Sequence, residues 1–146
     1  MDFKNIPAYK AVLGIILTGV VLIILVFLSA PPDTPYTSYN ISDTDDIMTF
    51  LSDLGWESDS MTITVQNSVL PVEFDDVFDH YNALQLQQKC DLSKFAGKEI
   101  TVYTVQITNY GKNNEHVYAT VIVHNGTVIG GDIHSAELNG FMHTLK

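Results

Sequence analysis

The chain has 146 residues, 17 acidic side chains against seven lysines, no arginine and a formal net charge of −10. Such an acidic surface repels phosphate groups, so nucleic acid and anionic lipid are poor partners. The single cysteine, Cys90, excludes an internal disulfide, and we expect the fold to depend on its apolar core alone.

The first feature along the chain is Ala11–Ala30 (AVLGIILTGVVLIILVFLSA), which contains no charged side chain. A helix of about 20 residues spans roughly 30 Å, the thickness of a bilayer's hydrocarbon core. We therefore predict a transmembrane anchor. The alternative is a signal peptide cleaved after Ala30. Against cleavage, the run is longer than a usual signal core, and Pro31-Pro32 would follow the cut.

Flanking charges predict the orientation of this segment. Lys4 and Lys10 precede it, and the next basic residue is Lys89. Because positive charge tends to stay in the cytoplasm, we expect residues 1–10 inside the cell. Residues 31–146 would then lie outside, held at the membrane or secreted if the segment is cleaved.

Pro31–Asn40 (PPDTPYTSYN) predicts an extended linker, because its three prolines favour extended backbone and it offers little to bury. One domain then spans 41–146. It begins with a helix that Ser42 or Thr44 caps and Gly55 ends. Its apolar stripe recurs at helical spacing: Ile47, Phe50, Leu51 and Leu54.

A short strand and a second helix follow. Met61–Gln66 is rich in β-branched residues and predicts a strand with Ile63 and Val65 facing inward. The helix begins after Pro71, and its apolar residues again recur at helical spacing: Phe74, Val77, Phe78, Tyr81 and Leu84.

Three further strands form the rest of the predicted sheet. Ile100–Asn109 alternates between apolar and polar residues. Val117–His124 and Thr127–His134 flank Asn125-Gly126, a strong signal for a type I′ hairpin turn. That turn would pair Val123 with Val128 and Ala119 with Asp132, and Gly130-Gly131 suggests a bulge or a close backbone approach.

These elements predict an α+β fold in the order α-β-α-β-β-β. It has about four antiparallel strands, with both helices packed on one face of the sheet. The tail carries three apolar residues without a regular period. We expect it to fold back on the core or to present an apolar patch to a partner: Leu138, Phe141 and Met142.

Several phrases of the sequence resemble a bacterial domain-of-unknown-function family, 4830 in that series. They are FLSDLGWE from Phe50, DLSKFAGKEITVYTVQITNY from Asp91, GGDIHS from Gly130 and LNGFMH from Leu138. The resemblance implies one membrane or signal segment before a small domain in a Gram-positive type cell envelope, and it implies no activity.

The chain departs from the pattern of that family at three positions. Gly111 stands where the family has proline, His134 where it has cysteine and Asn139 where it has aspartate. A thiol role at the position of His134 is therefore absent here.

Patterns that identify enzymes are missing from the sequence. It contains no G-x-S-x-G, C-x-x-C, H-E-x-x-H, P-loop or Rossmann glycine pattern. Cys90 would lie at a helix end whose dipole disfavours a thiolate. If Cys90 is exposed, a membrane-impermeant maleimide would test the topology. We expect no cofactor.

Two groups of residues remain as weak metal-site candidates. Asp132 and His134 project from one strand face, and with His143 they could form a two-histidine, one-carboxylate site. Alternatively, His134 packs beside Val117 and His143 is simply exposed. A run of aspartates could bind calcium, although acids at a helix start usually complement its dipole: Asp43, Asp45 and Asp46.

The sequence thus favours a membrane-anchored extracytoplasmic module that acts through protein contacts or regulation. The alternative is a metal-dependent or enzymatic cell-envelope domain that uses Asp132, His134 and His143. A passive spacer is a third reading.

Overall fold

Helix α2, Thr44–Asp53, forms because its first turn is capped and one of its faces is apolar. Asp43 is the N-cap, and Asp46 accepts in return from the Asp43 N–H, which completes a capping box. The expectation that Ser42 or Thr44 caps this helix is therefore wrong. Three residues of the predicted stripe are fully buried: Ile47, Phe50 and Leu51.

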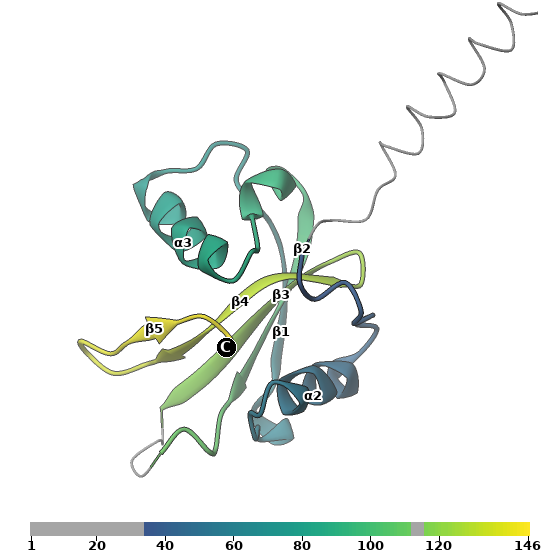
Figure 1. The fold of residues 1–146 in the computed structure, drawn as a ribbon, viewed down its shortest axis with the longest axis vertical. Coiled ribbons are helices and arrows are strands. Elements are labelled where there is room, and N and C mark those ends of the chain that lie inside the picture. The colour runs from purple at the N-terminus through teal and green to yellow at the C-terminus, as the bar shows by residue number, and fades with distance from the viewer. Residues whose placement is uncertain (1–33, 112–115) are drawn as a thin grey trace, which may run out of the picture. The chain divides into compact units, whose positions relative to one another are not determined.

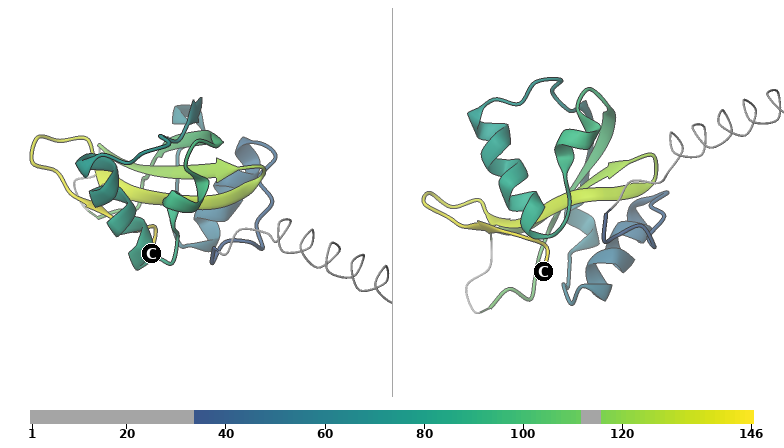
Figure 2. Two further views of the ribbon diagram at one scale, coloured as in Figure 1. Left: turned by 90° about the horizontal axis from the view of Figure 1, so that it is seen from above. Right: turned by 45° about the horizontal axis from the view of Figure 1, so that its top comes forward.

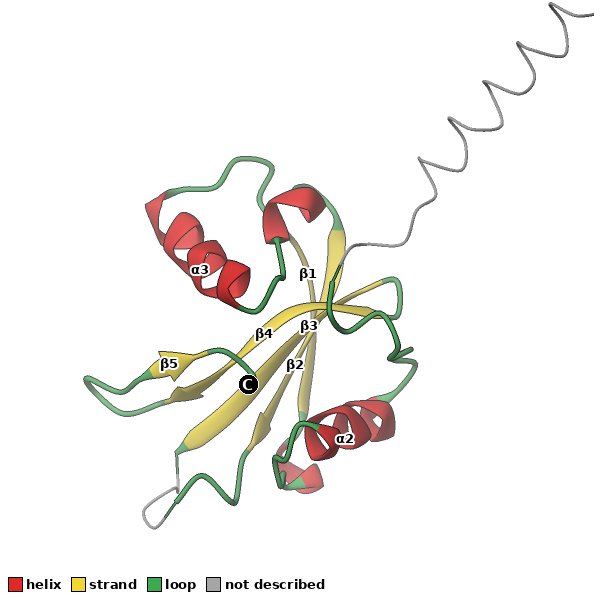
Figure 3. Cartoon of the chain, viewed as in Figure 1, coloured by secondary structure: helices red, strands yellow, loops and turns green. Residues whose placement is uncertain are grey.

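The computed structural model describes residues 34–111 and 116–146. They form an α+β fold whose antiparallel sheet has the strand order β1-β2-β3-β4-β5 (Figures 1 and 3). Its strands are β1 Thr64–Val69, β2 Glu99–Gln106, β3 Val117–His124, β4 Thr127–Ser135 and β5 Met142–His143. Besides α2, its helices are α3 Asp76–Gln87 and two 3-10 helices, Ser60–Thr62 and Leu92–Phe95.

The predicted anchor at Ala11–Ala30 lies outside the described residues. Within the two ranges that the structure describes, every helix is too short or too polar to cross a bilayer. The predicted strand count missed β5, which pairs with β4 through only two residues.

The two α-helices cover opposite faces of the sheet (Figures 1 and 2). On the α2 face, Val121 packs in a core with Phe50, and on the α3 face its neighbour Ile122 packs with Leu92 and Phe78. The prediction of both helices on one face is therefore wrong. The error arose because β2 and β3 carry apolar side chains on both faces over part of their length.

The β3–β4 hairpin turns at Asn125-Gly126, whose φ angles of 48° and 77° fit the predicted type I′ turn. Val123 pairs with Val128 as expected, but Ile122 pairs with Gly130, so Ile129 is an extra residue. This bulge shifts the later register by one residue.

The shift determines which neighbours the candidate site residues meet. Asp132 pairs with Thr120 rather than Ala119, and His134 pairs with Tyr118 rather than lying beside Val117. Both side chains consequently face α3.

Two elements differ from the predicted pattern in their burial. β1 begins three residues later than the predicted strand, and Val65 is 52% exposed rather than inward. In α3, Val77 is 74% exposed, whereas Asn82 and Gln85 are buried. Polar amides occupy the inner positions of α3 because they bond backbone groups nearby.

The amides at the end of α3 bond the edge of β4. Gln85 Oε1 accepts from the Gly131 N–H (2.8 Å) and from Gln88 Nε2 (2.6 Å), which also donates to the Gly131 carbonyl (2.7 Å). Gln85 Nε2 is buried without a hydrogen-bond partner among the described residues. This edge is therefore closed by side chains where β5 does not reach.

The ends of the described chain pack into the α2-side core. Thr34 and Tyr36 are buried, so the described part of the expected linker belongs to the domain. Leu145 is also fully buried, and its carbonyl accepts from Trp56 Nε1 (2.7 Å). The end of the tail thus folds back on the core through Leu145. The three apolar residues on which the prediction rested are instead exposed: Leu138, Phe141 and Met142.

Candidate functional site

Strand β1 forms one edge of the sheet and is exposed along its whole length. None of its six residues is charged. On its outer side, no strand built from the described residues pairs with it. Proteins usually block such an edge with lysine, proline or a bulge, and β1 contains none of these.

A hydrogen bond at the end of β1 identifies its outward-facing backbone groups. Leu70 donates its N–H to the Lys98 carbonyl (3.0 Å), so the Leu70 backbone faces β2. Backbone direction alternates along an antiparallel strand. The N–H and C=O groups of three residues therefore point to the open edge: Val65, Asn67 and Val69.

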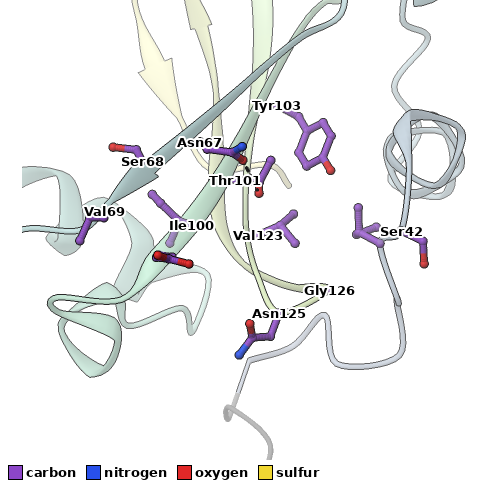
Figure 4. A pocket seen from close by; sticks show the side chains of 12 residues that line it. Ser42, Asn67, Ser68, Val69, Ile100, Thr101, Tyr103, Val123, Asn125 and Gly126 are labelled. Atoms are coloured by element: carbon purple, nitrogen blue, oxygen red, sulfur yellow. Dashed lines mark hydrogen bonds between the residues drawn. The ribbon is translucent and has the colours of Figure 1, made fainter.

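A cavity of about 670 Å³ lies beside β1 on the α2 face of the sheet. Side chains from β1, β2 and β3 form its floor, and the β3–β4 turn and the segment before α2 border it (Figure 4). Its polar and apolar lining includes Ser42, Asn67, Val69, Glu99, Thr101 and Tyr103.

The polar groups of this cavity include one carboxylate and no lysine among the described lining residues. Thr101 Oγ1 donates to Asn67 Oδ1 (3.0 Å), and the Tyr103 hydroxyl points toward the space between Thr101 and Ser42 (Figure 4). The carboxylate belongs to Glu99. The cavity is therefore suited to a hydrogen-bond donor or a cation.

A second cluster lies on the α3 face around Asp132, which is 2% exposed. Its Oδ2 accepts from the Tyr81 hydroxyl (2.6 Å), and its Oδ1 lies 2.7 Å from His134 Nδ1. Burial and then the charge of Asp132 raise the pKa of Tyr81 well above its ordinary value. Tyr81 therefore stays protonated and acts as a donor to the carboxylate.

Asp132 fixes the orientation of the His134 ring. Because the carboxylate accepts at Nδ1, the neutral ring carries its proton there and leaves a lone pair on Nε2. The His134 side chain is 26% exposed and stacks on Tyr118 with ring centroids 6.0 Å apart. A carboxylate that orients histidine in this way supports a base or a metal ligand.

His143, the third member of the predicted metal cluster, lies on the other face of the sheet. β5 pairs His143 with Ile133, which belongs to the α2-side core. The His143 Nε2 lies 2.9 Å from the Tyr110 hydroxyl, and its Nδ1 lies 2.6 Å from the Thr144 carbonyl. The structure brings Asp132 and His134 together and separates His143 from them. Across the described ranges, no three His, Cys, Asp or Glu side chains could hold a metal ion.

The remaining candidates have structural roles in the described residues. Asp43 and Asp46 accept backbone N–H groups at the start of α2, and Asp45 lies in the same first turn. Cys90 is fully buried, and burial raises the pKa of its thiol to about 12. Such a thiol is inert, so Cys90 cannot report the topology of the folded protein.

A family model described as Domain of unknown function (DUF4830) matches residues 50–133, more than half of the chain. The chain belongs to this family. No curated protein and no solved structure matches it. The matched part of this DUF4830 chain includes β1, Tyr81 and Asp132, whereas His134 lies one residue beyond its end.

Sequence reasoning found Asp132 and His134 but missed Tyr81, Tyr118 and the open edge. Tyr81 was counted in an apolar stripe, although its hydroxyl is the part that contacts Asp132. The signal for the open edge is the uncharged strand TVQNSV itself, because an exposed strand without a blocking residue invites pairing.

Proposed function

We propose that this DUF4830 protein is a membrane-anchored module on the outer face of the cell membrane that binds an extended segment of a partner protein along β1. One observation carries the proposal: the outward backbone groups of Val65, Asn67 and Val69 face an open edge. An extended peptide adds a strand to such an edge, and its main-chain hydrogen bonds supply affinity. Ala11–Ala30 and the lysines before it support the anchor and its orientation.

A photo-crosslinking residue at Val65 tests this proposal in intact cells. We expect it to capture a partner, because Val65 lies on the open edge. A crosslinker at Leu138, which is 95% exposed on the far hairpin, should not capture the same partner.

Asn67→Pro provides the decisive variant. Its N–H faces outward, so proline removes a donor for the partner without breaking a backbone hydrogen bond to β2. It also removes the exposed side-chain bond from Thr101 Oγ1 to Asn67 Oδ1. The Val65 crosslink should disappear while the melting temperature changes little. Gln66→Pro is the matched control, since it removes an N–H that faces β2 and should destabilise the sheet. A crosslink that survives Asn67→Pro, or that is equal at Leu138, would contradict strand addition.

The topology has its own test. Met61 is 93% exposed and Cys90 is buried, so Met61→Cys places one reactive thiol on the domain. A membrane-impermeant maleimide should label this variant before lysis, with the parent chain as the unlabelled control. Labelling only after lysis would refute an outside domain.

A second candidate is a metal-dependent or enzymatic cell-envelope domain, which the buried carboxylate behind His134 favours. The open Nε2 would accept a proton or bind a metal ion completed by solvent or substrate oxygens. Zinc should then raise the melting temperature of the parent chain and of His143→Gln, but not of His134→Gln. His134→Gln with an unchanged metal response and an unchanged cellular phenotype would dismiss this candidate.

A further inference from the structure

The cavity beside β1 carries a charge that restricts what can occupy the open edge. Glu99 pairs with Val69 across β1 and β2, so both side chains lie on the cavity face. Its neighbour Lys98 alternates to the opposite face. Lys98 therefore does not neutralise the Glu99 carboxylate.

The surroundings of the cavity are acidic as well. Between residues 31 and 88 the chain has eleven acidic side chains and no lysine or arginine. Ser42, at the cavity wall, is followed directly by the acidic start of α2. A cationic partner would be drawn to this region and an acidic one repelled.

We propose that the occupant of β1 is a lysine- or arginine-bearing extended segment of a partner protein, with a basic side chain that crosses β1 to Glu99. This inference rests on the proposed function and names its partner by chemistry. Every second side chain of an added strand faces the cavity, so basic residues at alternating positions fit the site.

The distances and the apolar surface of β1 favour a long basic side chain. Adjacent strands lie about 4.8 Å apart, which places an added strand roughly 10 Å from β2. The methylenes of lysine or arginine residues at alternating positions would cover Val65 and Val69, which are 52% and 57% exposed. The charged group beside Val69 would then reach the Glu99 carboxylate, and one beside Val65 would lie near Tyr103.

A second copy of the chain is the main competing occupant. Pairing of β1 with its copy would bring two acidic surfaces together, since each chain carries a formal charge of −10. Charge therefore opposes this arrangement and favours a basic segment.

The test uses the full chain in nanodiscs of neutral lipid and fluorescent eight-residue peptides. The peptides alternate threonine with lysine, glutamine or glutamate, and a fourth lysine peptide has N-methylated backbone amides. Anisotropy should show the lysine peptide binding tightest and the glutamate peptide weakest. N-methylation should abolish binding, because charge alone does not supply strand pairing.

Three substitutions localise the effects of charge and of strand pairing on peptide binding. Glu99→Gln should weaken binding of the lysine peptide about fivefold, the size expected for one partly exposed ion pair. Glu137→Gln, on the β4–β5 hairpin, is the charge-matched control and should leave binding unchanged. Asn67→Pro should abolish binding of every peptide.

The outcomes separate the two proposals. Equal binding of glutamine and lysine peptides, both lost in Asn67→Pro, would overturn the basic partner and keep strand addition. Binding that survives N-methylation and Asn67→Pro would reflect charge attraction alone and overturn both, as would no binding of any peptide. A dimer in sedimentation that Asn67→Pro disrupts would assign β1 to a second copy and overturn the basic partner.

Discussion

At the β4 edge of the sheet, the Gly131 N–H and carbonyl bond to the side chains of Gln85 and Gln88. At the β1 edge, no described side chain bonds the outward backbone groups of Val65, Asn67 and Val69. In the described part of the chain, two amides at the end of α3 therefore lie against one edge, and the other edge is open. This contrast indicates that the open edge is available for binding, because the same fold contains the means to close an edge.

The largest expected effect on stability comes from adding a side chain at Gly131, on the closed β4 edge. In Gly131→Ala, the new Cβ would meet the Thr120 carbonyl oxygen and Leu145 Cδ1, the latter at 2.9 Å. Because a strand backbone cannot easily move, we expect a loss of about 3 kcal/mol in the free energy of unfolding. Ser68→Ala on β1 is the control and should change it by less than about 0.5 kcal/mol. Urea denaturation measures the free energy of unfolding of both variants. Equal losses would contradict the difference between the closed β4 edge and the open β1 edge.

A smaller loss of stability is expected when Gln85, whose amide oxygen accepts from the Gly131 N–H, is replaced. Gln85→Leu leaves the buried Gly131 N–H without its acceptor, which costs about 2 kcal/mol. Removal of the partnerless Gln85 Nε2 offsets part of this cost. The same replacement on the open edge, Gln66→Leu, should be nearly neutral in urea denaturation. A neutral Gln85→Leu would show that the amides do not close the edge.

Tyr81→Phe would loosen the attachment of α3 to β4. It removes the hydroxyl that donates to buried Asp132, so we expect a loss of about 1 kcal/mol. Tyr118→Phe is the control, because the Tyr118 hydroxyl has no hydrogen bond to any described residue. Thermal unfolding of the two variants should differ by several degrees, and matching melting temperatures would count against a role for Tyr81.

The smallest expected effect on stability concerns Asp91, whose carboxylate accepts a hydrogen bond from the Asn82 side chain on α3. The Ser93 hydroxyl donates to Asp91 and lowers the pKa of its carboxyl. A lowered folded-state pKa stabilises the fold above the unfolded value of about 3.9, and this stability is lost as pH falls through the folded value. The stability difference between the parent and Asp91→Asn should therefore shrink below about pH 4. A constant difference across acid titration would refute this role.

Local patterns in the sequence predicted several elements correctly. The stripe of Ile47, Phe50 and Leu51 predicted α2, and Asn125-Gly126 predicted the hairpin, because both signals act over a few neighbouring residues. The family was also recognised from short phrases.

Features that depend on distant contacts could not be read in the same way. Asn82 and Gln85 look solvent-exposed in a sequence, yet they are buried because their amides bond backbone groups far along the chain. Asp132 and His134 were placed on one face correctly, but the choice of face depended on the bulge. Tyr81 lies 51 residues from Asp132, and no local pattern connects them.

The bulge at Ile129 also makes the length of β4 as important as its composition. Without the bulge, a strand of the present length would exchange the faces of every side chain after Ile129. Ile133 would then face α3, and Asp132 and His134 would face the apolar core under α2. A DUF4830 relative that is one residue shorter between Val128 and Asp132 would keep the present register without a bulge, so an identical GGDIHS phrase would form the same surface on a straighter strand.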